Sequence, residues 1–137
     1  MAGYSGTPLP KKLGIKDAFR VAFIGLPPDV KSELKDALGR CEAAKDDEGS
    51  LDFAMIFVKS AADLEKSFAQ FAKRLMPAGM LWVCWPKKSS GVVSDLTEDE
   101  VRKIGLAAGL VDVKVCAVNE VWSGLKFVIR LKDRQKN

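Results

Sequence analysis

Three short runs of the sequence are almost continuously apolar, and they limit the fold more than any other feature. The runs cover residues 21–25, 51–58 and 80–85. A strand with one solvent-facing side alternates apolar and polar residues, so runs without alternation predict strands buried on both faces. Such strands occur where helices cover both sides of a parallel sheet. The chain is therefore expected to be an α/β protein.

Helical patterns separate these runs. Pro27 and Pro28 follow the first run and predict a helix start, because proline suits the first helical turn. Ser60-Ala-Ala-Asp63 and Thr97-Glu-Asp-Glu100 have the spacing of capping boxes, in which the side chain of the first residue accepts a backbone N–H three residues later. Three helices are therefore expected to alternate with the strands.

The carboxyl-terminal part has a different period. Val111, Val113 and Val115 alternate with polar residues, and a second alternating segment runs from residue 125 to 131. A turn is expected at residues 119–124. This period of two predicts a half-buried antiparallel hairpin at the end of the sheet.

The order of elements predicts a three-layer α/β/α Rossmann-like sandwich, with a mostly parallel sheet that ends in an antiparallel hairpin. Residues 19–131 are expected to form this single domain. Residues 1–18, rich in glycine and proline, are expected to be an extended amino-terminal arm with at most one turn around residues 10–13. Residues 132–137 are expected to be a frayed tail.

Composition excludes several functions. The chain has no histidine, so hydrolases that work through histidine are excluded, and three widely spaced cysteines do not form a zinc-binding pattern. No apolar run approaches the roughly 20 residues that span a bilayer, and the first residues do not resemble a secretion signal. We expect a cytoplasmic protein with reduced thiols. The net charge of +4 favours anionic partners slightly.

The loop after the third apolar run is the best candidate for a site. Its side chains offer two ammonium groups, two hydroxyls and an aromatic wall at a strand end, where open α/β sheets bind ligands: Trp85, Lys87, Lys88, Ser89 and Ser90. Such a loop would hold a carboxylate or phosphate. The alternative is a solvated loop whose lysines aid solubility and whose tryptophan closes the core.

Two further segments suggest partners. Tyr4, Lys11 and Lys12 in the arm could fold over the strand ends as a lid on the same ligand. No recognised nucleic-acid motif is present, so nucleic acid is not the expected partner. Trp122 near the hairpin turn is either a partner surface, for example in a homodimer, or a packed turn residue.

Three stretches resemble the class I methyltransferase fold. Residues 51–58 resemble its fourth strand, residues 74–83 resemble the entry to its fifth strand, and residues 107–113 with the following hairpin resemble its last two strands. The resemblance implies a short version of that fold and, by extension, an S-adenosylmethionine site. The turn Gly25-Leu-Pro-Pro-Asp29 departs from the cofactor pattern, because it has one glycine and its prolines remove N–H donors. Glu42 is the nearest candidate for the acidic ribose ligand.

At a closer level the chain resembles an uncharacterised bacterial family, domain of unknown function 3052. The stretches that carry this resemblance are residues 4–9, 11–15, 85–91, 95–98, 113–117 and 122–128. The family implies no activity. We therefore expect a non-catalytic module without a cofactor that binds a small anion or a protein partner. The alternatives are a minimal S-adenosylmethionine-dependent methyltransferase and a dimerisation module.

Overall fold

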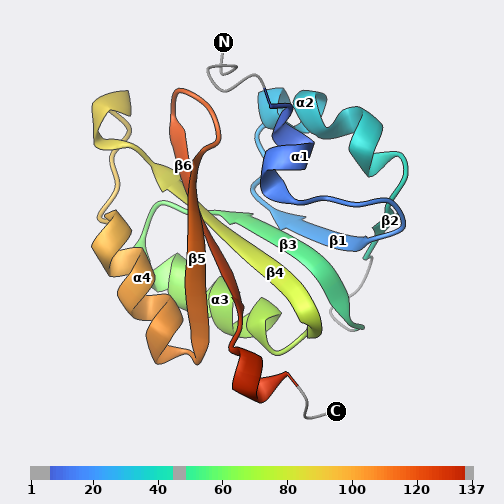
Figure 1. The fold of residues 1–137 in the computed structure, drawn as a ribbon. Coiled ribbons are helices and arrows are strands. Elements are labelled where there is room, and N and C mark those ends of the chain that lie inside the picture. Colours follow the sequence, from blue (N-terminus) through green and yellow to red (C-terminus); the bar gives the residue numbers. More distant parts are fainter. Residues whose placement is uncertain (1–6, 45–48, 135–137) are drawn as a thin grey trace.

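The fold is built on one six-stranded sheet. The computed structural model describes residues 7–44 and 49–134. The strands are β1 (Arg20–Ile24), β2 (Glu42–Ala43), β3 (Leu51–Phe57), β4 (Leu75–Pro86), β5 (Leu110–Ala117) and β6 (Trp122–Ile129), in the spatial order β2-β1-β3-β4-β6-β5 (Figure 1). The first four strands pair in parallel, and β6 is antiparallel to both β4 and β5. The predicted parallel sheet with a closing hairpin is confirmed, and β5 is left at one edge.

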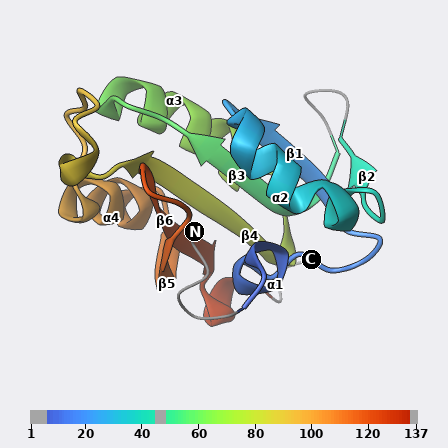
Figure 2. The same ribbon diagram turned by 90° about the horizontal axis from the view of Figure 1, so that it is seen from above.

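Helices cover both faces of this sheet, which confirms the three-layer architecture (Figures 1 and 2). α3 (Ala61–Ala72) and α4 (Glu98–Ala107) lie on one face, and α1 (Leu9–Leu13) and α2 (Pro28–Leu38) lie on the other. Short 3-10 turns, η2 (Lys88–Ser90) and η3 (Leu131–Asp133), follow β4 and β6. Each face has its own buried apolar cluster, so the continuous apolar runs are explained by burial on both sides.

The helix starts follow the predicted capping. Ser60 Oγ accepts the backbone N–H of Asp63 at 3.1 Å, and Thr97 Oγ1 accepts that of Glu100 at 3.2 Å. Each of these bonds satisfies one of the N–H groups that a helix start leaves unpaired. α2 begins at Pro28, directly after Pro27, as the pair of prolines predicted.

Residues 7–18 of the expected amino-terminal arm are described, and helix α1 lies where a single turn was expected around residues 10–13. Residues 9–13 form helix α1, because Leu9 and Leu13 lie four residues apart and both enter the core beneath α2. The indole N–H of the fully buried Trp82 donates to the carbonyl of Leu13 at 2.9 Å. The segment is therefore part of the packed layer. At the other end, residues 131–133 form the turn η3 where a frayed tail was expected.

The pattern of valines in β5 also differs from the prediction. The pairing with β6 shifts between Asp112 and Lys114, so Val113 is an extra, bulged residue. A bulge reverses which face the later side chains occupy, since strand side chains alternate. Val113 and Val115 are consequently 53% and 50% exposed, whereas Cys116 is buried.

The bond from Trp82 to Leu13 should hold α1 on the sheet. Trp82→Phe keeps an aromatic ring but leaves the Leu13 carbonyl without its donor, which should lower the free energy of unfolding by about 1–3 kcal/mol. The backbone amides of Gly14 and Ile15, which donate to Pro10 O, should exchange faster with solvent. Trp85→Phe is the matched control, because Trp85 lies in the core on the opposite face. Equal exchange at Gly14 in both variants would contradict this role.

Candidate anion-binding site

In the loop after β4, the hydroxyl of Ser90 forms its hydrogen bonds with the backbone of the same loop. The hydroxyl of Ser90 donates to Lys87 O at 2.6 Å and accepts the N–H of Val92 at 3.1 Å. Lys88 and Ser89 are exposed on η2, and Lys87 is half-buried. Trp85 is only 5% exposed and belongs to the core beneath α3 and α4, so it does not form the expected exposed wall. Of the predicted loop residues, Lys87, Lys88 and Ser89 have side chains that remain accessible to a ligand.

The turn after β1 is closely packed. Gly25 has φ +70°, and a Cβ at this position would lie 2.9 Å from the carbonyl oxygen of Phe57 in β3. Only glycine therefore fits here, for a reason of packing. Asp29, in the first turn of α2, accepts a hydrogen bond from Asn119 Nδ2 at 2.9 Å. The ring of Trp122 packs edge-on against Phe57 with centroids 5.1 Å apart. Side chains of the hairpin thus cover the end of β1 and β3.

The structure brings four lysines together on the α1 side of the sheet. Lys114 of β5 and Lys126 of β6 are directly paired across the hairpin. Lys114 Nζ donates to Lys12 O at 3.1 Å, and Lys12 Nζ donates to Ala117 O at 3.5 Å. A Cβ on Gly14 would lie 3.7 Å from Lys126 Nζ, so this ammonium lies at the end of α1. We call Lys12, Lys16, Lys114 and Lys126 the lysine cluster.

The charges of the lysine cluster act on one another. Burial, followed by the positive charges of Lys114 and Lys16, lowers the pKa of Lys126. Within residues 7–44 and 49–134, the ion pairs involve Arg20, Arg40 and Arg102, and no carboxylate pairs with the lysine cluster. Like charges at facing strand positions destabilise a sheet, so the cluster costs stability as long as no anion binds it.

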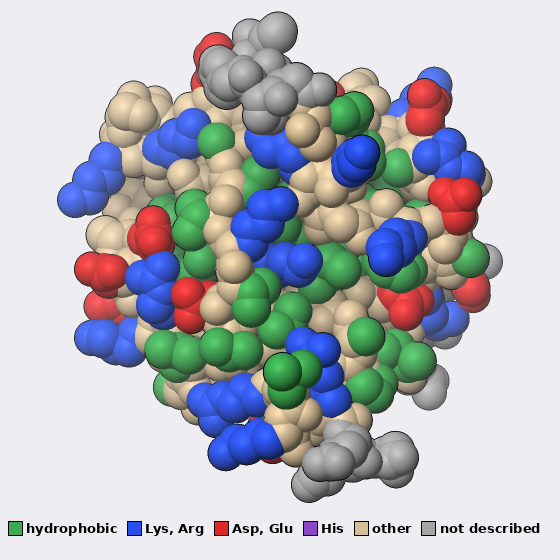
Figure 3. Space-filling model, viewed as in Figure 1, with side chains coloured by type: hydrophobic (Ala, Val, Ile, Leu, Met, Phe, Trp, Pro, Cys, Tyr) green, Lys and Arg blue, Asp and Glu red, His purple; other side chains and the backbone are tan. Residues whose placement is uncertain are grey.

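The buried thiol of Cys116 lies beside the lysine cluster, and the positive charges of the cluster affect its pKa. Burial raises the pKa of the Cys116 thiol, and the charges of Lys12, Lys114 and Lys87 oppose that rise. The positive charge of Lys87, in the β4 loop, thus acts on the same thiol as the charges of Lys12 and Lys114. On the face shown in Figure 3, Lys and Arg side chains gather over the centre, where β5, β6 and α1 meet.

The sequence predicted part of this site. Lys12 and Lys87 approach it, but Lys11 is exposed on the other side of α1, in a groove with Glu33 and Asp36 of α2. Tyr4 lies outside the described residues. Sequence reasoning missed Lys16, Lys114 and Lys126. The sequence feature that could have indicated this site is a lysine on each strand of the predicted hairpin. That these two lysines pair can be inferred only if the register of the hairpin is known.

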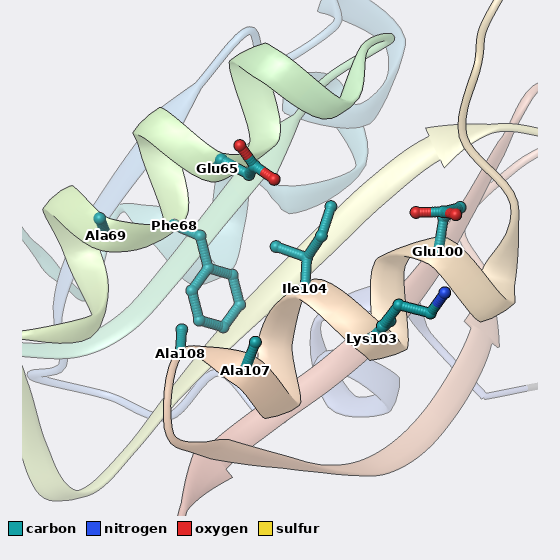
Figure 4. Close-up of a pocket in the computed structure, with 8 residues that line it drawn as sticks. All are labelled: Glu65, Phe68, Ala69, Glu100, Lys103, Ile104, Ala107 and Ala108. Atoms are coloured by element: carbon teal, nitrogen blue, oxygen red, sulfur yellow. The ribbon is translucent and has the colours of Figure 1, made fainter.

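A second hollow, of about 420 Å³, lies between α3 and α4 on the opposite layer (Figure 4). Phe68 and Ile104 point into it from the two helices, and Glu65, Glu100 and Lys103 surround it. It is remote from the lysine cluster, and its mixed charges favour no single class of ligand.

Among the residues that the structure describes, no helix has the length and apolar character needed to cross a membrane.

Comparison with protein families gives a match over most of the chain. The model of a family described as "Protein of unknown function (DUF3052)" matches residues 11–131. The sequence has no significant match among curated proteins. The family comparison therefore covers nearly the whole chain and carries no activity with it.

Solved structures resemble this fold at low sequence identity. A TehB-like SAM-dependent methyltransferase from Corynebacterium glutamicum superposes with a TM-score of 0.57 at 9% identity, over 89% of this chain and 85% of that one. A SAM-dependent methyltransferase from Aquifex aeolicus gives 0.54 at 17% identity, over 88% and 87%. CalO1, a methyltransferase of calicheamicin biosynthesis in its SAH-bound form, gives 0.64 at 13% identity, over 92% and 54%. The similarity establishes a methyltransferase-like, Rossmann-like fold.

Proposed function

This chain belongs to the family of unknown function DUF3052, and we propose that it is a non-catalytic module that binds an anionic ligand at the lysine cluster. The observation that carries the proposal is the direct pairing of Lys114 with Lys126, beside Lys12, without a carboxylate partner among the described residues. A ligand with several negative charges would convert this repulsion into attraction.

The nature of the cationic groups indicates the kind of ligand. Lysine ammonium groups act as point charges without the planar fork of arginine, so they suit phosphate groups that present charge in several directions. The ammonium groups come from α1, β5 and β6, with Lys87 at the end of β4, and together they favour a ligand with more than one phosphate. Inorganic tripolyphosphate is a suitable first probe.

The geometry of the β1 turn argues against a retained cofactor. In the proposed binding module, Gly25 serves close packing against Phe57, and Asp29 is bound by Asn119. Pro27 and Pro28 remove two N–H groups from the place where a phosphate or carboxylate cradle would need donors. A minimal methyltransferase remains the second candidate, because solved methyltransferases, one in an SAH-bound form, have the same fold.

Calorimetric titration with tripolyphosphate at low salt tests the proposal. We expect binding that weakens as salt concentration rises, and at least a tenfold loss of affinity in the double variant Lys114→Ala with Lys126→Ala, since one charge-assisted hydrogen bond contributes about 1.5–3 kcal/mol. Lys66→Ala with Lys73→Ala is the matched control, because it removes the same charge from exposed positions in α3 and directly after it. Equal affinity of the two double variants would refute the site.

A thermal-unfolding series with S-adenosylmethionine separates the two candidates. A ligand at about 100 times its dissociation constant adds about 2.7 kcal/mol of stability. The binding module should show this shift with tripolyphosphate and none with S-adenosylmethionine. The reverse pattern would favour the methyltransferase.

A further inference from the structure

Within residues 7–44 and 49–134, no strand pairs with the outer edge of β5. β5 is the last strand of the sheet and pairs only with β6 among the described residues. The N–H of Val118, just beyond the strand, donates to Trp122 O at 2.9 Å across the hairpin. Backbone groups of successive residues point to opposite sides of a strand, so Val115 and Ala117 direct their N–H and C=O groups away from β6. The contact of Lys12 Nζ with Ala117 O agrees with this direction.

The two sides of this edge differ in chemistry. Val115 pairs with Leu125 and therefore lies on the α4 side, where it is 50% exposed next to the bulged and equally exposed Val113. Lys114 lies on the α1 side, together with Lys12. The edge is thus apolar on one side and positively charged on the other. A strand that added here would present its own side chains alternately to these two sides.

We propose that β5 binds an extended segment of a partner protein that alternates apolar and acidic residues, as a seventh strand of the sheet. Backbone hydrogen bonds to Val115 and Ala117 supply the pairing, and the alternation gives the specificity. The apolar side chains cover Val113 and Val115, and the acidic ones face Lys114 and Lys12. Lys12 then exchanges its contact with Ala117 O for a carboxylate.

Charge complementarity favours an acidic partner over a second copy of this chain. Antiparallel pairing of two β5 edges about their centre would bring two Lys114 side chains close together, and facing like charges are unfavourable. A lysine on an edge strand disfavours pairing of that strand with a second copy of itself and leaves pairing with an acidic segment favourable. This inference shares Lys12 and Lys114 with the proposed phosphate site, but its backbone pairing uses only the outer edge of β5.

The test uses a capped synthetic peptide that alternates valine and glutamate. In an NMR titration of the intact protein, the largest shift changes are expected at residues 113–117, with slower hydrogen exchange at the amides of Val115 and Ala117. Two further peptides carry N-methyl groups on alternate amides. In one peptide the methylated amides are those that would face β5, and in the other they are those that would face away from it. One of these two peptides should bind at least tenfold more weakly than the other. A valine–lysine peptide should not bind.

A protein variant checks the same edge. Val115→Pro removes an outward N–H without removing a bond to β6, so it should abolish peptide binding and retain tripolyphosphate binding. Should this variant not fold, the N-methylated peptides test the edge on the unchanged protein. Equal affinity of both N-methylated peptides, or no binding of any peptide, overturns the proposal and leaves the phosphate site standing. If the unchanged protein self-associates and Val115→Pro abolishes that self-association, the proposal is overturned and the occupant of the edge is a second copy of this chain.

Discussion

Gly105→Ala is expected to destabilise the protein by about 2 kcal/mol or more, although the same change in an exposed helix would stabilise it by about 1 kcal/mol. Gly105 lies in the last turn of α4, and a Cβ there would overlap the ring of Phe127 in β6. Phe127 is fully buried and packs edge-on against Phe68, with centroids 5.2 Å apart, so its ring has no room to move. Thermal unfolding should show a loss of roughly 6–10 °C.

A second substitution identifies the cause. Phe127→Leu removes ring volume at the point of overlap and should itself destabilise the core. The double variant should lose less stability than the sum of the losses of the two single variants, because the alanine methyl then fills part of the space that the ring leaves. Strict additivity, or a stabilising Gly105→Ala, would mean that α4 packs farther from β6 than the structure has it.

Gly25→Ala is expected to cost roughly 2–3 kcal/mol. The φ of +70° alone costs an alanine about 1–2 kcal/mol, and the methyl would also meet the Phe57 carbonyl oxygen at 2.9 Å. That oxygen belongs to the backbone of a central strand and cannot move without disturbing its neighbours. Chemical denaturation measures the change in the free energy of unfolding.

Gly91 supplies the matched control for this prediction. Gly91 has a similar φ of +79°, but a Cβ there meets nothing within 4 Å. Gly91→Ala should therefore incur only the conformational cost. If Gly25→Ala were as mild as Gly91→Ala, the β1 turn would have room for a ligand, and the case for a lost cofactor site would weaken.

Much of the fold could be predicted because it depends on local patterns. The almost continuous apolar run of β3 specified a central strand, and Ser60 and Thr97 specified helix starts by their own hydrogen bonds. The bulge at Val113 could not be predicted, because it has no residue signature and depends on how β5 pairs with β6. Only a single turn was expected at the position of helix α1, because its stability comes from two leucines buried beneath α2 and from a tryptophan far along the chain.

The candidate site was less predictable than the fold. The loop after β4 drew attention because its lysines and serines are adjacent in sequence, but the hydroxyl of Ser90 is used within the loop. The lysine cluster joins residues about a hundred positions apart, Lys12 with Lys114. Only the pairing of strands and the docking of α1 bring them together. Two roles were open for Trp85, a wall of the site and closure of the core, and its burial beneath α3 and α4 supports the second.

The attachment of α1 has a consequence for the order in which the chain folds. The carbonyls of Leu13 and Lys12 receive their donors from Trp82 and Lys114, residues that leave the ribosome much later. Helix α1 is synthesised well before these donors and is therefore expected to dock late, because closing such long loops requires the sheet to exist first. Until β4 and β5 form, α1 lacks these two donors, and only its packing beneath α2 covers Leu9 and Leu13.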